Sequence, residues 1–136
     1  MIRILVADDH ALVRESIRAL LANQGDMEIV ATAGDGNEAV QLAMFHQPDV
    51  VVMDISMPNM DGIHATELIR QAQDAINIVI LSMHVNAALV QQAMRMGARG
   101  YVLKRRATDE LPEAVRAAYN GELFLSPAIP SSFLPR

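Results

Sequence analysis

The sequence predicts an α/β fold, in which a parallel sheet carries helices on both faces, and three observations support this prediction. Short runs rich in Ile and Val alternate with segments of helical periodicity, in the order βαβαβαβαβα. The apolar runs are mostly continuous, which is typical of strands buried on both faces of a parallel sheet. With 136 residues, of which 51% are hydrophobic, the chain is long and apolar enough for one domain with a substantial core.

Each element has its own signal. We expect strands over residues 2–7, 28–32, 49–53, 77–82 and 100–103. Each intervening helix, and the helix after the last strand, shows apolar residues at helical spacing. The members of these five stripes are Val13, Ile17, Leu20 and Leu21; Ala39, Val40, Ala43 and Met44; Ile63, Leu68, Ile69 and Ala72; Val90, Ala93 and Met94; and Leu111, Ala114, Val115 and Ala118.

Residues at the predicted helix ends support these assignments. Asn86 and Thr108 are expected as the N-caps of the fourth and fifth helices, and Gly97 and Gly121 as their ends. Pro112 falls in the first turn of the fifth helix, where a missing N–H is tolerated.

The chain changes character after residue 121. Three of its six prolines, Pro127, Pro130 and Pro135, lie in the last ten positions. We therefore assign residues 1–121 to one domain and expect residues 122–136 to be a Pro-rich tail that begins a linker.

Composition excludes several functional classes. The net charge of −5 disfavours a nucleic-acid-binding module, and the absence of Cys excludes disulfides and thiolate metal sites. No signal peptide or membrane-length apolar run is present, so we expect a cytoplasmic protein that does not contact a membrane. Residues 75–108 contain no acidic residue, which indicates either a partner-binding surface or a chance cluster. The basic residues of that stretch are Arg95, Arg99, Lys104, Arg105 and Arg106.

Chemically active side chains follow four of the predicted strands. These are Asp8 and Asp9 after the first, Asp54 after the third, Ser82 at the end of the fourth and Lys104 after the fifth. Parallel strands direct such residues to one edge of the sheet, where ligands bind in open α/β folds. Grouped carboxylates need a hard cation such as Mg²⁺, and a nearby lysine suits a phosphoryl oxygen. The set therefore predicts phosphoryl transfer to an aspartate.

Each residue alone also has an ordinary structural explanation, as a turn residue or a helix cap. Lys104 is the exception, because it is the single lysine among eleven basic residues. Glycine-rich nucleotide-binding motifs are absent from the sequence, which argues against a nucleotide enzyme. The four histidines are scattered and are expected at the surface or in loops.

These residues resemble the receiver domain of bacterial two-component response regulators, and the similarity covers residues 1–121. It rests on Asp8-Asp9 after an apolar strand, on Asp54 within VVVMDISMPNMDG, and on Ser82 and Lys104. The segments SMH, GARGYVLK and GELFLSP are similar to those of the NarL/FixJ, or LuxR-type, subfamily. The resemblance implies a CheY-like (flavodoxin-like) doubly wound sheet of five strands in the order 2-1-3-4-5, with five helices.

The resemblance also implies a role for each residue. Asp54 would accept a phosphoryl group from a sensor histidine kinase, and the chain would act as a signalling switch rather than as an enzyme. Phosphotransfer and slow dephosphorylation would be self-catalysed. The implied metal is Mg²⁺, or Mn²⁺, at Asp8, Asp9, Asp54 and the Ser56 carbonyl. Lys104 and Ser82 would contact the phosphoryl group, with Ser82 and Tyr101 as the switch pair. Met57, Pro58, Asp61 and Gly62 would shape the following loop, and Ser56 and His84 would tune the phosphoryl lifetime.

The sequence departs from the subfamily in two respects. Arg105 and Arg106 follow Lys104, where the subfamily has an acidic or small residue. The subfamily also continues into a DNA-binding domain that this sequence lacks, so we expect a receiver cut from a longer transcription regulator rather than a stand-alone one. A phosphorylation-dependent homodimer through the first and fifth helices is a further expectation. The alternatives are a Mg²⁺-dependent phosphohydrolase, which usually needs an acid where Ser56 stands, and a pseudo-receiver that only binds partners.

Overall fold

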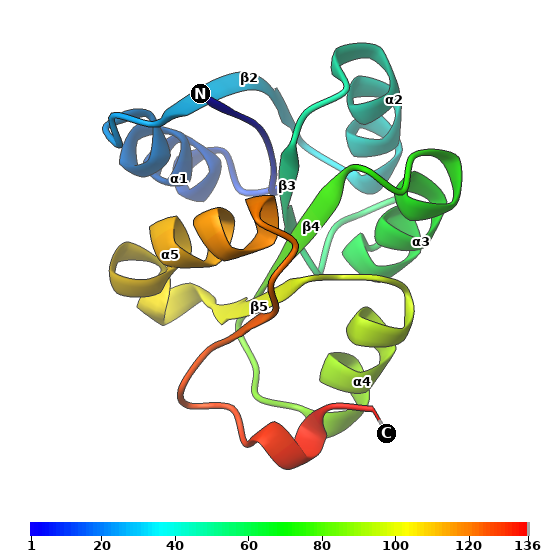
Figure 1. Cartoon of the computed structure of the whole chain (residues 1–136). Helices are drawn as coiled ribbons and strands as arrows, with labels where there is room; N and C mark the ends of the chain where they lie inside the picture. The colour runs from blue at the N-terminus through cyan, green and yellow to red at the C-terminus, as the bar shows by residue number, and fades with distance from the viewer. Residues whose placement is uncertain (136) are drawn as a thin grey trace.

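The computed structural model describes residues 1–135, in which a central parallel sheet is covered by helices on both faces (Figure 1). The strands are β1 (Ile2–Ala7), β2 (Met27–Ala33), β3 (Val50–Asp54), β4 (Asn77–Ser82), β5 (Gly100–Leu103) and β6 (Phe124–Leu125). The helices are α1 (Ala11–Ala22), α2 (Gly36–His46), α3 (Gly62–Ala72), α4 (Ala87–Arg95) and α5 (Ala107–Tyr119). Two 3₁₀ turns complete the described chain, η1 (Lys104–Arg106) and η2 (Ser131–Phe133).

The strand order is β2-β1-β3-β4-β5-β6, and every neighbouring pair is parallel. The expected CheY-like order of the first five strands is therefore confirmed. The expectation of five strands is wrong by one, because β6 adds a short edge strand in the described part of the chain. Two residues beside a Pro-rich segment are too few to give a periodic signal, so the sequence pattern did not reveal β6.

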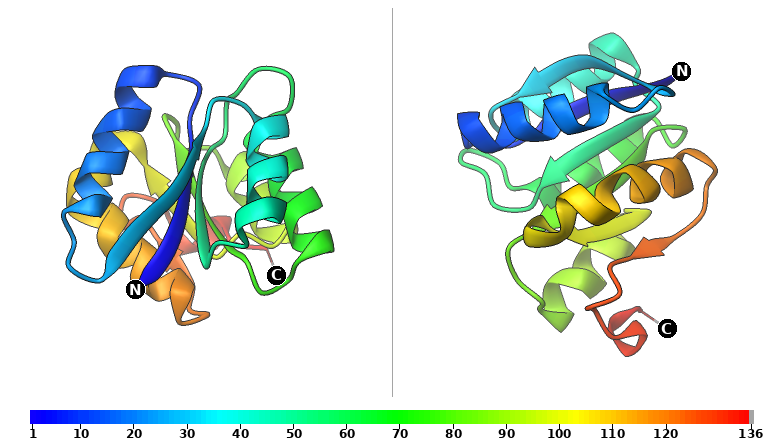
Figure 2. Two further views of the ribbon diagram at one scale, coloured as in Figure 1. Left: turned by 90° about the horizontal axis from the view of Figure 1, so that it is seen from above. Right: turned by 90° about the vertical axis from the view of Figure 1, so that its left-hand side faces the viewer.

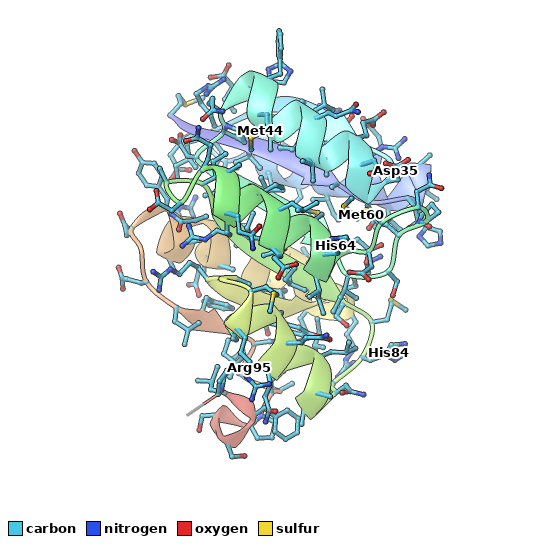
Figure 3. The ribbon with its side chains drawn as sticks, turned by 90° about the vertical axis from the view of Figure 1, so that its right-hand side faces the viewer. Asp35, Met44, Met60, His64, His84 and Arg95 are labelled. Carbon is cyan, nitrogen blue, oxygen red and sulfur yellow. The ribbon has the colours of Figure 1, made fainter. Side chains whose placement is uncertain are left out.

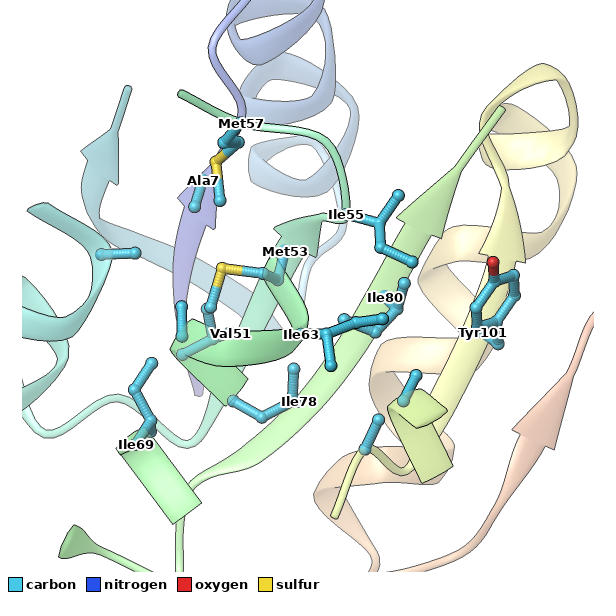
Figure 4. Packing of buried hydrophobic residues seen from close by; sticks show 14 of the residues in the cluster. Ala7, Val51, Met53, Ile55, Met57, Ile63, Ile69, Ile78, Ile80 and Tyr101 are labelled. Atoms are coloured by element: carbon cyan, nitrogen blue, oxygen red, sulfur yellow. The ribbon is translucent and has the colours of Figure 1, made fainter. Parts of the chain in front are cut away.

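Helices cover the two faces unequally, as the two views of Figure 2 show. One face carries α1 and α5 over a cluster that includes Ile4, Val6 and Val102. The opposite face carries α2, α3 and α4 over a cluster that includes Met53 and Tyr101, drawn in Figure 4. Successive strand residues thus point to opposite layers, and both layers are apolar, which explains the continuous apolar runs in the sequence.

Of the two predicted N-caps, Asn86 is confirmed. The side chains of Asp35, Asp61 and Asn86 accept hydrogen bonds from backbone N–H groups in the first turns of α2, α3 and α4. Thr108, in contrast, is not an N-cap: α5 begins at Ala107, directly after the turn η1. The chain therefore enters α5 already coiled, without a side-chain cap at Arg106.

The segment after α5 packs against the domain. Backbone N–H groups of Phe124 and Ser126 donate to the carbonyls of Arg99 and Tyr101 at 2.9 and 3.0 Å. Ile129 is only 4% exposed and belongs to the cluster beneath α4, and Phe133 packs against that cluster. The segment after α5 therefore packs against the core of the domain, while a linker role for it stays a prediction.

Candidate functional site

The carboxyl ends of β1 and β3 place Asp8 and Asp54 beside one another at the edge of the sheet. Asp8 is fully buried and Asp54 is 2% exposed. Lys104 follows β5, and its Nζ lies 3.0 Å from Asp8 Oδ2 and 3.1 Å from Asp54 Oδ2. The structure thus brings together three residues that lie about 50 positions apart from one to the next, as the sequence predicted.

Burial and charge tune this group. Burial, together with repulsion from Asp8, raises the pKa of Asp54 to about 6, although Lys104 opposes the shift. Burial alone would lower the pKa of Lys104, but the carboxylates of Asp8 and Asp54 outweigh it and raise that pKa. At neutral pH, Asp54 is therefore an ionised carboxylate that one ammonium group compensates only in part.

The site suits a hard divalent cation. Ligand atoms of Asp8, Asp9, His10 and Asp54 all lie within 4.8 Å of one another. Asp8 Oδ2 and Asp54 Oδ2 share the single ammonium group of Lys104, and Asp9 Oδ1 faces only the exposed imidazole of His10. Three carboxylates are thus compensated by one ammonium group, and carboxylate oxygens are the ligands that Mg²⁺ prefers. The donor set therefore fits a magnesium ion.

His10 is the one member of this cluster that sequence reasoning missed. Its Nδ1 lies 3.1 Å from Asp9 Oδ1 and 3.4 Å from Asp8 Oδ1, although its side chain is 67% exposed. Its backbone N–H donates to Asp8 Oδ1 at 2.9 Å and so helps to fix that carboxylate. The sequence did show that His10 is adjacent to Asp9. Because no second histidine lies at ligand spacing, that adjacency gave no reason to predict His10 as part of the site.

Ser82 is the last residue of β4, at the same edge of the sheet, but its side chain is hydrogen-bonded to the loop that follows β4. Its Oγ donates to the His84 carbonyl at 3.2 Å and accepts from the His84 N–H at 3.1 Å. The Tyr101 ring is fully buried, and burial raises the pKa of its hydroxyl, an effect that the nearby Ser82 hydroxyl partly offsets. In the described structure that tyrosine hydroxyl has no partner at hydrogen-bond geometry. Ser82 and Tyr101 are therefore neighbours, and neither is engaged with Asp54.

The loop from β3 to α3 is held at both ends. Gly62 begins α3 so close to β3 that a Cβ there would lie 2.1 Å from the Asp54 carbonyl oxygen. Asn59 has a φ of 67° and donates from Nδ2 to Asp35 Oδ2 at 3.0 Å. Figure 3 shows Asp35 and Met60 at this junction, from α2 and from the loop. The loop after Asp54 is thereby fixed against two helices.

The other predicted loop residues lie around this junction. Met57 is buried in the core cluster, Pro58 is exposed, and Asp61 caps α3 by accepting from the His64 N–H at 2.8 Å. Ser56 is exposed, and its N–H donates to Asp54 Oδ1 at 3.3 Å.

The basic stretch over residues 75–108 is largely at the surface. Its four arginines, Arg95, Arg99, Arg105 and Arg106, are exposed, and so is His84, which Figure 3 shows on the loop before α4. Tyr101, in the same stretch, belongs to the interior. None of the helices in residues 1–135 has the length and apolar character needed to cross a bilayer.

Comparison with known proteins defines the class. The doubly wound sheet, with Asp8, Asp9, Asp54 and Lys104 following its strands at one edge, has the architecture of a receiver domain. The family model described as "Response regulator receiver domain" matches residues 4–116, so the chain belongs to that family. Receiver domains bind Mg²⁺ at an acidic pocket, and this chain has such a pocket.

Two curated relatives indicate which kind of response regulator the chain is similar to. Oxygen regulatory protein NreC of Staphylococcus carnosus is 41% identical over 133 residues, which are 97% of this chain and 61% of that protein. Transcriptional regulatory protein DegU of Brevibacillus brevis is 37% identical over 94% of this chain and 54% of its own length. The chain thus spans little more than half of these curated relatives.

Solved structures of response regulators are similar to this chain in both sequence and fold. The LuxR-family two-component response regulator from Aurantimonas sp. SI85-9A1 is 41% identical with a TM-score of 0.89, over 93% of this chain and 91% of that one. The receiver domain of the putative NarL of Mycobacterium tuberculosis is 35% identical with a TM-score of 0.85, over 89% and 98%. The expected resemblance to LuxR-type receivers is confirmed.

Proposed function

We propose that Asp54 is the phosphoacceptor of a two-component switch and that a sensor histidine kinase is the donor. The observation that carries this proposal is the contact of Lys104 with both Asp8 and Asp54, at 3.0 and 3.1 Å. An Asp54 oxygen attacks the phosphorus of a phosphohistidine, the P–N bond breaks, and its electron pair leaves with the imidazole. Lys104 is already at the acceptor and stabilises the added phosphoryl charge.

Asp9, Asp54 and the Ser56 carbonyl would hold Mg²⁺ or Mn²⁺, with Asp8 acting through water. The ion supplies charge compensation for a dianionic group that enters an acidic pocket. Phosphorylation then makes a contact available for Ser82, which has to leave its two hydrogen bonds with His84. Ser56 and His84 are exposed beside the acceptor and are placed to affect the approach of the hydrolytic water.

The wider assignments belong to the same proposal. The chain acts as a cytoplasmic switch and not as a turnover enzyme, and it controls transcription through a DNA-binding region that follows the receiver in the whole protein. The relatives named for transcriptional and oxygen regulation support this assignment.

The test is the intact mass after incubation with Mg²⁺ and acetyl phosphate. The native chain should gain one phosphoryl group, whereas Asp54→Asn, which keeps the shape without the nucleophile, should gain none. Asp74→Asn, which changes an exposed carboxylate on the α3–β4 connection, is the matched control and should behave like the native chain. A phosphoryl gain by Asp54→Asn would overturn the assignment, and rapid repeated turnover would favour the phosphohydrolase alternative.

A further inference from the structure

The C-terminal segment crosses the edge of the sheet from one helical layer to the other. It leaves α5, pairs with β5 as β6, and ends beside α4, as both Figure 1 and the right view of Figure 2 show. Ser126, fully buried at the crossing, donates from Oγ to the carboxylate of Glu110 in α5. Glu110 in turn pairs with Arg106 at 3.3 Å. The segment is therefore anchored at the crossing by a buried polar contact.

Beyond this anchor, the segment covers apolar surface. Ile129 is part of the same buried cluster as Val90, Ala93 and Tyr101, and Phe133 packs against it. The turn η2, which contains Phe133, contacts α4. Residues 126–134 thus cover apolar side chains of α4 that would otherwise face solvent, and contiguous apolar surface of this kind marks an interaction site.

The covered surface is connected to the candidate switch residues by main-chain bonds. Tyr101 pairs with Leu125 across the β5–β6 edge, and its carbonyl accepts the N–H of Ser126. Ser82, at the end of β4, lies next to Tyr101 of β5. Ser82 is also hydrogen-bonded to His84, in the loop that leads into α4. A movement of Ser82 toward Asp54 therefore disturbs the strand and the helix on which the segment rests.

We infer that the surface of α4 and β5 is an interaction surface occupied at rest by residues 126–134 of the same chain, and that phosphorylation of Asp54 releases them. This inference rests on the proposed function. Residues 126–134 pack on α4 and β5 in the conformation in which Ser82 is hydrogen-bonded to His84 and Tyr101 is buried. If Ser82 and Tyr101 rearrange, the segment loses part of its contacts with α4 and β5. Docking of the segment therefore favours the resting conformation.

Linkage makes this inference quantitative, because coupling between two sites is reciprocal. If a phosphoryl mimic at Asp54 weakens docking of the segment by some factor, then undocking strengthens binding of the mimic by the same factor. Coupled sites of this type differ by roughly 5- to 150-fold.

Amide hydrogen exchange with and without beryllofluoride and Mg²⁺ measures the first half of the linkage. The N–H groups of Ser126 and Ile129 are both hydrogen-bonded at rest and should exchange slowly. With the mimic bound, their exchange should accelerate at least about fivefold, the lower end of such coupling. The N–H of Asp49 in the turn before β3, which donates to Arg3, serves as an internal reference and should not change.

Beryllofluoride titration of variants measures the second half. Ile129→Ser removes the buried apolar contact of the segment and should bind the mimic at least about fivefold more tightly than the native chain. Phe133→Ser changes a partly buried contact and should act in the same direction with an intact core. Leu123→Ser alters an exposed leucine that precedes β6, outside the docked segment, and should leave the affinity unchanged.

The outcomes separate the two proposals. If beryllofluoride does not bind at Asp54 at all, the proposed function fails. If it binds but the exchange of Ser126 and Ile129 and the affinities of the Ile129→Ser and Phe133→Ser variants stay at native values, the inference about the segment is overturned while the receiver function stands.

Discussion

Lys104 is the residue on which the chemistry of the site depends. It contacts two buried carboxylates at once, yet the pKa of Asp54 still stands at about 6. One ammonium group does not offset the burial of a carboxylate beside another one. The acceptor is therefore kept in its ionised form at a cost in folding free energy, and this cost can be measured.

Replacing Asp54 by Asn should stabilise the protein at neutral pH in the absence of Mg²⁺. A raised pKa means that the folded state binds the proton more tightly, so stability falls as the pH rises from about 4 to about 6 and stays low above it. A pKa raised from 3.8 to about 6 corresponds to at most about 3 kcal/mol. Urea unfolding should show Asp54→Asn to be more stable by about 1–3 kcal/mol at pH 7.5, and equally stable near pH 4.

Asp74→Asn is the control for this measurement, because Asp74 is exposed and its replacement should change stability little at either pH. A gain for Asp54→Asn that is the same at pH 4 and pH 7.5 would exclude titration of Asp54 as its cause.

At the scale of elements, the position of the acceptor depends on how closely α3 approaches β3. The first residue of α3, Gly62, leaves no room for a Cβ against the Asp54 carbonyl. Its N–H also donates to the Ile55 carbonyl at 2.9 Å, so helix and strand are joined by main chain alone. The glycine is required here for close approach rather than for an unusual φ.

Gly62→Ala should therefore displace α3 and disturb the acceptor. Overpacking of this kind costs about 1–3 kcal/mol, and phosphorylation by acetyl phosphate should slow because the Asp54 geometry changes. Gly25→Ala is a matched control, since a Cβ at Gly25 meets nothing within 4 Å. Chemical denaturation and the rate of phosphoryl gain measure both effects. A Gly62→Ala variant with native stability would show that the contact is relieved without cost.

How far the sequence predicts the elements depends on the strength of the local signal. Continuous Ile and Val runs predicted the first five strands to within one or two residues, and Asn86 marked the start of α4. Strand β6 and the turn η2 are too short for periodicity, and only tertiary contacts with β5 and α4 form them. Thr108 failed as a cap because η1 already supplies the coil that leads into α5.

The sequence likewise predicted the residues of the site that lie at strand ends, but not the contacts that depend on loop conformation. Strand ends predicted the meeting of Asp8, Asp54 and Lys104, since parallel topology determines where strands end. The bonds between Ser82 and His84, and the approach of His10 to Asp9, depend on loop conformation, which has no periodic signal in the sequence.

At the scale of the whole molecule, ion binding and folding are coupled. The proposed ligands come from the ends of β1 and β3, in the centre of the sheet, so the ion binds only when the whole sheet is formed. An excess of tenfold over the dissociation constant adds about 1.4 kcal/mol, which should raise the unfolding temperature by roughly 3–6 °C for a domain of this size.

Thermal unfolding in Mg²⁺ and in a chelator measures this coupling. Asp9→Ala should lose most of the increase, whereas Asp8→Ala should lose less of it, because the proposal places Asp9 in direct contact with the ion. An equal increase in Asp9→Ala and in the native chain would contradict the proposed ligand set.

The two hydrogen bonds between Ser82 and His84 determine how many unmodified molecules have a free Ser82 hydroxyl. Each is an ordinary neutral bond with a net worth of about 1 kcal/mol, so releasing the serine costs only about 2 kcal/mol. At equilibrium, that gap leaves roughly 3% of unmodified molecules with the serine free. Under the proposed function, this is the fraction of the resting population whose Ser82 hydroxyl is already free of its loop before any phosphoryl group arrives.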